Sequence, residues 1–276
     1  MILITGATGN IGGATLDALA GDGHRVRALS RSERTWPEGV EGVTGDLDDA
    51  ESLVRLTDGV EAVFLLSGYA GTERLLEALR AAGAKRAVLL SSSSAPSGDE
   101  TNAVARYHIE AERTVRDSGL EWTMLQPNSF MSNALQWVPQ LGSGDVVRGP
   151  FGSIPVAAVD PADVGAVAAL ALTEPGHAGQ EYRLSGPESL LPEQQVAILG
   201  RVLGRDLRWE GWSDEQARTE LERQMPTPYV DAFFSFFVDG LIDETTVQPT
   251  VPEVLRRPAR SFETWARAHA DAFATR

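Results

Sequence analysis

Cysteine is missing from all 276 residues of the sequence. Its absence excludes structural disulfides, zinc sites built on thiolates and cysteine nucleophiles. A chain without cysteine fits a reducing compartment, so we expect a cytoplasmic protein. Long apolar runs are missing too: none approaches the length of a membrane span, and residues 1–4 are too few for a signal-peptide core. We therefore expect no membrane association, and we predict no metal site.

Positive charge is scarce. The chain has 24 Lys and Arg against 39 Asp and Glu, a formal net charge of −15, and its pI is about 4.7. Such a surface repels phosphate backbones and anionic lipids, which argues against direct binding to nucleic acid or membranes. The hydrophobic fraction of 42% is ordinary for a globular protein and allows a large core. We expect a small-molecule partner; a monomer and a homodimer both fit the sequence.

Apolar segments typical of strands alternate with segments typical of helices as far as residue 170. This alternation predicts βαβ units and a parallel sheet. The strand segments are continuously apolar, as expected when helices cover both faces of the sheet. The expected strands are 1–5, 25–29, 42–44, 62–66, 87–91 and 122–125, and the expected helices are 11–20, 48–57, 71–82 and 103–118. The predicted fold class is α/β, a doubly wound parallel sheet of the Rossmann type.

The pattern changes after residue 142. Residues 142–155 are rich in glycine and proline and predict a long loop with a weak strand. There is no internal repeat and no low-complexity tract. A helix at 160–175, a strand at 181–186, helices at 192–204 and 213–224, and a densely aromatic segment at 229–241 are expected to follow. These segments predict a smaller, discontinuous C-terminal part.

Gly6, Gly9 and Gly12 lie between the first expected strand and the first expected helix. In a dinucleotide site one such glycine permits the tight turn, one lets the backbone approach the pyrophosphate, and one allows close helix–strand packing. The N–H groups and positive dipole end of the helix then favour phosphates. The alternative is a simple turn. We predict an NAD(P)-binding domain at 1–150, to which 155–186 returns, and a substrate-binding part at 187–276. Further cofactor contacts are expected from Thr8, Asn10 and Ile11.

The second expected strand ends in Ser30 and Arg31 instead of an acidic residue. An acidic residue there would bind the ribose 2′-OH of NAD, whereas an arginine would pair with the 2′-phosphate of NADP. We therefore predict that NADPH is preferred over NADH and is bound by Arg31 with help from Arg34. The alternative for Arg31 is a solvated surface side chain.

The segment GDLDD at 45–49 follows the third expected strand. We expect Asp46 and Leu47 to cap the adenine, because the carboxylate accepts from the amino group and the aliphatic chain packs on the ring. Asp46 or Asp48 is also in a position to cap the next helix.

Several motifs resemble one family of oxidoreductases. They are GATGNIGG at 6–13, the arginine after the second strand, GDLDD at 45–49 and the serine run at 91–94. These motifs resemble the atypical short-chain dehydrogenase/reductases, and more narrowly their NmrA-like and NAD(P)H:quinone-reductase-like branch. The likeness covers essentially the whole chain, with further landmarks at 108–135, 160–165, 182–190 and 257–266.

The resemblance implies a Rossmann fold, an NAD(P)H cofactor and a reductase activity. It implies that Ser93, after the fifth expected strand, faces the pocket. Further cofactor contacts are expected from Ser67, Gly68, Ser91, Pro127 and Asn128. Many relatives carry arginine where this chain has Gln126, so we expect a substrate without an anionic group.

The usual proton donor of ketone-reducing members is incomplete. Those enzymes use a tyrosine with a lysine four residues later, whose ammonium lowers the tyrosine pKa. Here Tyr107 is followed by Ala111 at the lysine position, so its pKa should stay near the ordinary value of about 10. Tyr107 is then a weak donor or merely the start of a helix. His108 is a second candidate donor, because histidine titrates near neutral pH, or else a solvated residue bonded to Glu112.

A site without a strong acid restricts the substrate. A quinone accepts hydride to give a weakly basic phenolate, and an aromatic ketone with its own phenol can be protonated from within the substrate. An aliphatic ketone would give a strongly basic alkoxide that needs a donor. The aromatic segment at 229–241 favours a flat apolar substrate. The residues expected to bind it are Phe130, Met131, Phe233 and Phe237.

We therefore predict an NADPH-dependent reductase of a quinone or polycyclic aromatic ketone. Its candidate catalytic residues are Ser93, Tyr107 and His108. The alternative is a non-catalytic NAD(P)-binding redox sensor that acts through a protein partner, since the missing lysine fits both interpretations.

Overall fold

The computed structural model describes residues 1–46 and 50–274, which form two compact units. Unit 1 comprises Met1–Gly98, Arg106–Pro127 and Pro161–Arg183, and unit 2 comprises Asp99–Ala105, Asn128–Asp160 and Leu184–Arg276. The chain thus passes into unit 2 directly after Pro127, earlier than the boundary expected at residue 150. The loop-rich character on which that boundary rested begins only after a short helical stretch that already belongs to unit 2.

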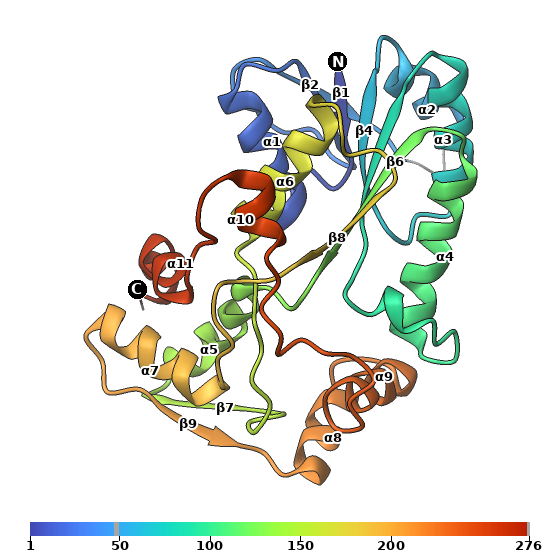
Figure 1. Ribbon diagram of the computed structural model, residues 1–276. Helices are drawn as coiled ribbons and strands as arrows, with labels where there is room; N and C mark the ends of the chain where they lie inside the picture. Colours follow the sequence, from blue (N-terminus) through green and yellow to red (C-terminus); the bar gives the residue numbers. More distant parts are fainter. Residues whose placement is uncertain (47–49, 275–276) are drawn as a thin grey trace. The chain divides into compact units, whose positions relative to one another are not determined.

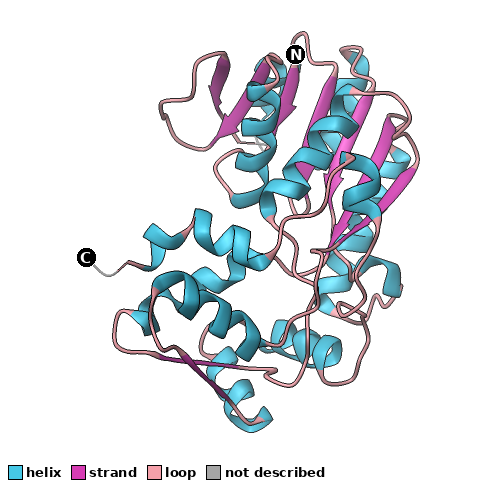
Figure 2. Ribbon diagram, turned by 60° about the vertical axis from the view of Figure 1, so that its left-hand side comes forward, coloured by secondary structure: helices cyan, strands magenta, loops and turns pink. Residues whose placement is uncertain are grey.

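Unit 1 is built on a seven-stranded sheet in the order β3-β2-β1-β4-β5-β6-β8. The pairs from β3 through β6 are all parallel. The strands are β1 (Ile2–Ile4), β2 (Val26–Ser30), β3 (Val40–Thr44), β4 (Ala62–Leu66), β5 (Arg86–Leu90), β6 (Glu121–Pro127) and β8 (Gln180–Leu184). Figure 2 shows them in magenta, with helices lying across the sheet. This confirms the predicted α/β class with a Rossmann-type sheet.

Helices cover both faces of this sheet. They are α1 (Asn10–Gly21), α2 (Ala50–Thr57), α3 (Thr72–Ala81), α4 (Ala103–Asp117) and α6 (Pro161–Thr173). Helices α1 and α6 pack together on one face, and α2, α3 and α4 lie on the other (Figure 1). The second face closes over a core of fully buried side chains such as Leu3, Leu65 and Leu76. Gly165 allows α6 to approach α1, because a Cβ there would lie 2.6 Å from the carbonyl carbon of Ala14.

The two edges of the parallel sheet differ in character. At the edge where the strands begin, Met1, Arg25 and Lys85 border a surface hollow. Lys85 is exposed, stands directly before β5 and is the single lysine of the chain. At the opposite edge the strands end in the glycine loop after β1, in Ser67 after β4 and in Ser91 after β5. Because parallel strands all end at one edge, the predicted cofactor residues gather there.

Unit 2 is mainly helical. It contains one small parallel sheet, β7 (Val146–Gly149) with β9 (Arg208–Gly211). Its core includes Leu141, Leu199, Phe262 and Trp265. Its helices are α5 (Val138–Leu141), α7 (Pro192–Leu203), α8 (Asp214–Glu222), α9 (Thr227–Phe237), α10 (Thr250–Leu255) and α11 (Phe262–Ala268), with 3-10 helices at Met131–Trp137 and Ala270–Phe273. Across the described ranges of both units, every helix is too short or too polar to cross a membrane.

Candidate functional site

The glycine loop between β1 and α1 has the geometry that a pyrophosphate needs. Gly6 has φ +60°, and a Cβ there would overlap the Leu66 side chain. A Cβ at Gly12 would overlap the carbonyl of Gly6, so the start of α1 lies directly against the loop. Gly9 is the N-cap of α1 and supplies no capping side chain. The loop therefore presents bare backbone at a helix N-terminus, and these residues fit a dinucleotide phosphate.

The residues around this loop are arranged as the motif requires. Thr8, Gly9 and Asn10 are exposed at its tip, whereas Ile11 and Gly12 are buried. Ile11 thus packs in the core while Thr8, Gly9 and Asn10 face solvent. The structure brings the six predicted residues of the loop together at one place, and their contact with the cofactor remains a prediction.

Two exposed arginines, Arg31 and Arg34, follow the end of β2. The Ser30 hydroxyl donates to the Ser32 carbonyl (2.8 Å) and accepts from the Ser32 N–H (3.3 Å), which fixes the turn around Arg31. The Arg31 side chain is exposed and pairs with none of the described residues. The guanidinium of Arg34 lies 4.8 Å from the centre of the Trp36 ring. Arg31 is thus the better placed of the two to meet a 2′-phosphate.

The predicted adenine contacts are described only in part. Asp46 is exposed, and its backbone N–H donates to the Ser52 hydroxyl (3.3 Å). Leu47 and Asp48 lie outside the described residues. The predicted adenine cap therefore has one described member, Asp46.

Tyr107 and His108, on α4, both contact Ser67 at the end of β4. The Tyr107 hydroxyl donates to the Ser67 carbonyl (2.6 Å). The Ser67 hydroxyl donates to the Leu90 carbonyl (3.0 Å) and lies 3.2 Å from Nδ1 of His108. Since the single hydroxyl proton of Ser67 goes to Leu90, Nδ1 carries the hydrogen in the His108 contact. Gly68 has φ +90°, and a Cβ there would overlap the Tyr107 hydroxyl.

The surroundings of His108 differ from the expectation. Burial lowers its pKa to about 4, so the ring is neutral near pH 7 and the reason for choosing it as a proton donor does not hold. The alternative bond to Glu112 is wrong as well, because His108 pairs with Ser67 instead. His108 and Glu112 lie one turn apart on α4, but each has its own hydrogen-bond partners: His108 contacts Ser67, and Glu112 contacts Ser91.

The serine run after β5 turns mostly inward. Ser91, Ser93 and Ser94 are buried, and the Ser93 N–H donates to the carbonyl of Pro127 (2.9 Å), the last residue of β6. The Ser94 hydroxyl donates to the Ser92 hydroxyl (3.0 Å). The Ser91 hydroxyl donates to Glu112 (2.5 Å), so this side chain is committed to a carboxylate and not to the cofactor as expected.

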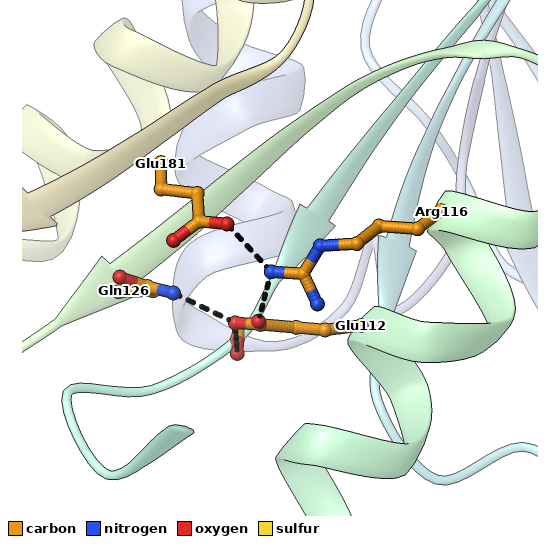
Figure 3. Close-up of polar contacts among 5 residues, drawn as sticks. Glu112, Arg116, Gln126 and Glu181 are labelled. Atoms are coloured by element: carbon orange, nitrogen blue, oxygen red, sulfur yellow. Dashed lines mark hydrogen bonds and ion pairs between the residues drawn. The ribbon is translucent and has the colours of Figure 1, made fainter. Parts of the chain in front are cut away.

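Sequence reasoning missed a buried polar cluster around Glu112, which is only 3% exposed (Figure 3). Its carboxylate accepts from Gln126 Nε2 (2.9 Å) and pairs with Arg116 (2.8 Å). Arg116 also pairs with Glu181 on β8 (2.6 Å). The cluster joins α4 to the neighbouring strands β5, β6 and β8. The spacing of Glu112 and Arg116, one helical turn apart, is the signal that could have revealed it.

The interpretation of Gln126 therefore changes. Its side chain is 2% exposed and donates to Glu112, so this residue satisfies a buried carboxylate. The absence of an arginine at this position consequently says nothing about the charge of the substrate.

The first residues of unit 2 are held by Glu244, whose side chain is buried. Its carboxylate accepts from the N–H (3.1 Å) and the hydroxyl (2.5 Å) of Ser129. The Asn128 amide donates to the Glu244 carbonyl (3.2 Å), while its Oδ1 is buried with no hydrogen-bond partner in the described parts of the chain. Glu244, more than a hundred positions away in the sequence, thus holds Asn128 and Ser129 in place.

Unit 2 contains a partly open cavity of about 270 Å³. Of the four predicted substrate residues, Phe130 and Phe237 line it. Met131 is only 2% exposed and packs in the core, and Phe233 stacks on Phe237 outside the lining (3° between planes, 6.5 Å between centres). The cavity is lined mainly by apolar and amide side chains: Phe130, Asn133, Trp137, Gln140, Phe151, Ile154, Val156, Leu190, Gln195, Trp209, Trp212, Leu221, Gln224 and Phe237.

Known proteins resemble this chain along its whole length. The model of the NmrA-like family matches residues 1–261. A (4-alkanoyl-5-oxo-2,5-dihydrofuran-3-yl)methyl phosphate reductase of Streptomyces griseus is 44% identical, and the match covers 99% of each chain. An NAD(P)H azoreductase of Xenophilus azovorans is 32% identical, again over 99% of each chain.

A solved structure of a reductase is also similar to this chain over its whole length. The NADPH complex of an NADPH-dependent quinone oxidoreductase from Escherichia coli has a TM-score of 0.79 and 25% identity, and the match covers 98% of this chain and 100% of that one. With the glycine loop in place, the chain is an oxidoreductase that uses a nicotinamide cofactor. It belongs to the NmrA-like family.

Proposed function

We propose that the protein transfers hydride from NADPH to an electron-poor conjugated carbonyl compound, such as a quinone or a doubly activated alkene. The observation that carries this proposal is the weak acidity of the strand-end edge. The Tyr107 hydroxyl hydrogen is donated to the Ser67 carbonyl, Ala111 stands at the lysine position, and His108 is neutral. Among the described residues of this edge, no group is set up to protonate a strongly basic alkoxide.

The chemistry of such acceptors suits this site. Hydride addition to a quinone leaves a phenolate. Addition to an alkene that carries two carbonyl groups on one carbon takes place at the other carbon and leaves an enolate spread over both oxygens. In each case the electron pair of the broken π bond rests on oxygen, the anion is weakly basic, and water can supply the proton. The name of the Streptomyces griseus relative describes such an alkene, since one carbon of its dihydrofuran double bond carries both the ring carbonyl and the alkanoyl group. This supports a wider acceptor class than quinones and aromatic ketones alone.

The residues that would hold the cofactor follow from the geometry. The loop from Gly6 to Gly12 would cradle the pyrophosphate, and Arg31 would pair with a 2′-phosphate, which favours NADPH. The bound nicotinamide would supply the hydride, and the protein would supply its orientation. We do not propose a redox sensor without turnover, because the two named relatives are reductases and their sequences match this chain over its full length.

A steady-state assay tests this function. NADPH oxidation is followed with a naphthoquinone, a 3-alkanoyl-2(5H)-furanone and an aliphatic methyl ketone as acceptors. We expect turnover with the first two and none with the ketone. Reduction of the ketone at a comparable rate would overturn the acid-free mechanism, and NADPH binding without turnover on any acceptor would overturn the proposed function.

The Tyr107→Phe variant serves as the matched control. Because the hydroxyl donates to the Ser67 carbonyl, we expect its removal to change kcat by less than about tenfold, well below the roughly 10²–10⁴-fold typical of a general acid. A larger loss with unchanged NADPH affinity would restore Tyr107 as the proton donor.

A further inference from the structure

We propose that the cavity of unit 2 binds an unbranched aliphatic arm of the substrate, such as an acyl chain. The inference rests on the proposed function, which places the conjugated acceptor group in the remainder of the molecule. It assigns the cavity a flexible chain and not a flat aromatic ring, and four features of the lining support this choice.

The first feature is the lack of available charge. Arg148 is the single ionic side chain among the cavity residues described, and Nη2 pairs with Glu210 (2.6 Å). Gln140 also holds the Arg148 backbone by accepting from its N–H (2.8 Å) and donating to its carbonyl (2.9 Å). Because the one cation already has an ionic partner and the rest of the described lining is uncharged, the cavity offers little that could offset the cost of dehydrating an anionic group. The cavity therefore suits an uncharged part of a substrate.

The second feature is the orientation of the rings. The planes of Trp137 and Trp209 are inclined by 57°, and those of Phe151 and Phe237 by 34°. The ring centres lie 6.3 Å and 5.0 Å apart, so the members of each pair contact each other and form an uneven wall, not one flat face on which a polycycle could stack. A saturated chain, in contrast, makes dispersion contacts with rings at any angle.

The third feature is the way the Trp209 ring is seated. A Cβ at Gly149 would lie 2.6 Å from its Cη2, and a Cβ at Gly152 would lie 2.9 Å from its Nε1. The ring thus packs closely against two glycines, and it also lines the cavity. The close contact with Gly149 and Gly152 restricts the position of the Trp209 ring, so this ring can form a fixed wall of the cavity against which an aliphatic chain packs.

The fourth feature is size. About 270 Å³ lies just below the range of roughly 300–1,000 Å³ typical of small-molecule sites, which suits one arm of a substrate better than the whole molecule. The chain also connects this lining closely to the sheet, because Phe130 follows Pro127, the last residue of β6, by three positions.

Binding without cofactor tests the inference apart from catalysis. The probes are 3-alkanoyl-2(5H)-furanones from acetyl to decanoyl, with 1,4-naphthoquinone as the flat competitor. Three lining tryptophans, Trp137, Trp209 and Trp212, make intrinsic fluorescence the readout. We expect the affinity to rise by up to about fourfold per methylene until the cavity is full, and then to level off. Affinity that is independent of chain length, or naphthoquinone binding tighter than every furanone, would overturn the inference.

Two variants with opposite effects locate the chain. Leu221→Ala enlarges the cavity and should shift the levelling-off point to longer chains, whereas Ile154→Phe fills it and should shift that point to shorter ones. Val238→Ala, an exposed position outside the lining, should leave the profile unchanged. If neither cavity variant moves the profile while both remain folded by circular dichroism, the inference fails.

The two proposals fail in different ways. Chain-length-dependent binding without NADPH oxidation would support the cavity assignment and contradict the proposed function. NADPH oxidation with acetyl and decanoyl furanones of equal affinity would do the reverse.

Discussion

The side chain of Arg31 is expected to decide which nicotinamide cofactor the protein uses. It is exposed directly after β2, whereas Arg34 lies over the Trp36 ring. A hydrogen bond between charged groups contributes about 1.5–3 kcal/mol, so Arg31→Ala should weaken NADPH binding by about 10- to 100-fold and leave NADH binding nearly unchanged. Fluorescence titration with both cofactors measures the ratio.

Arg34→Ala is the matched control for this prediction. Because the guanidinium of Arg34 stacks on Trp36, its removal should affect NADPH affinity less than that of Arg31. If Arg34→Ala proved the more damaging change, the roles of the two arginines would have to be exchanged.

His108 should make the stability of unit 1 sensitive to acid. Burial holds the folded pKa of His108 at about 4, below the ordinary value of 6.5, so the charged ring favours the unfolded chain. Its contribution is complete above about pH 6.5 and is lost as the pH falls toward 4, a decrease of up to about 3 kcal/mol.

The measurement is urea denaturation of the wild type and His108→Asn at several pH values. Other groups titrate in both proteins, so the difference between the two curves isolates His108. The variant should lose less stability across this interval; parallel curves would show that the folded ring titrates normally.

At the scale of elements, the junction of β1 and α1 should tolerate one glycine substitution and reject another. In Gly12→Ala the new Cβ overlaps the carbonyl of Gly6, so the loop must shift and the cofactor affinity should fall at least tenfold. In Gly13→Ala the nearest atom is the Ala7 carbonyl oxygen at 3.6 Å, an ordinary contact, and binding should be retained. Calorimetric titration with NADPH compares the two, and equal affinities would contradict the proposed cradle.

The cluster around Glu112 should act as a clamp between α4 and the sheet. Glu112→Gln leaves Arg116 with Glu181 alone and removes the anionic acceptor of Ser91 and Gln126. Breaking a buried pair costs about 3–5 kcal/mol, and we expect a loss near the lower end because Arg116 is partly exposed.

Glu110→Gln on the exposed side of α4 is the control for this loss and should change the stability by less than about 0.5 kcal/mol. Thermal unfolding of both variants gives the comparison. Similar melting temperatures of the two variants would show that the cluster around Glu112 contributes little to the stability of the fold.

The local sequence pattern predicted the strands and helices of unit 1 well. Buried parallel strands are recognised by short, continuously apolar runs, and amphipathic helices by the spacing of their apolar residues. The same reasoning missed β9 and the partners of Glu112. Strand β9 has four residues, of which three are exposed and one is partly buried. It therefore lacks an apolar pattern of its own, and it is a strand because it pairs with β7. Gln126 and Glu112 are separated by fourteen positions, and only the folded sheet brings the amide to the carboxylate.

At the scale of the whole molecule, the two units should respond to different ligands. Hydrogen exchange followed by mass spectrometry should show NADPH protecting the segments around β1, α1 and β2, and a decanoyl furanone protecting residues 130–156. At about a hundred times its Kd, a ligand that binds only the folded state stabilises it by about 2.7 kcal/mol. Protection of the same segments by both ligands would contradict the division of roles.

The division into units could not be predicted closely from the sequence. The chain leaves unit 1 after Gly98, after Pro127 and after Arg183, and it returns at Arg106 and at Pro161. The choice between units depends on which core the side chains join, as Met131 and Trp137 illustrate by packing with Leu199 of α7. Such long-range choices leave little trace in neighbouring residues.

The placement of Lys85 has a practical consequence. It is the only lysine side chain, it is exposed, and it stands at the edge where the strands of unit 1 begin, as does the amino group of Met1. Amine-reactive coupling to a solid support or a dye would therefore attach unit 1 by that edge and leave the glycine loop at the opposite edge open to solution. Immobilised in this way, the protein should keep its access to cofactor, without any engineered tag.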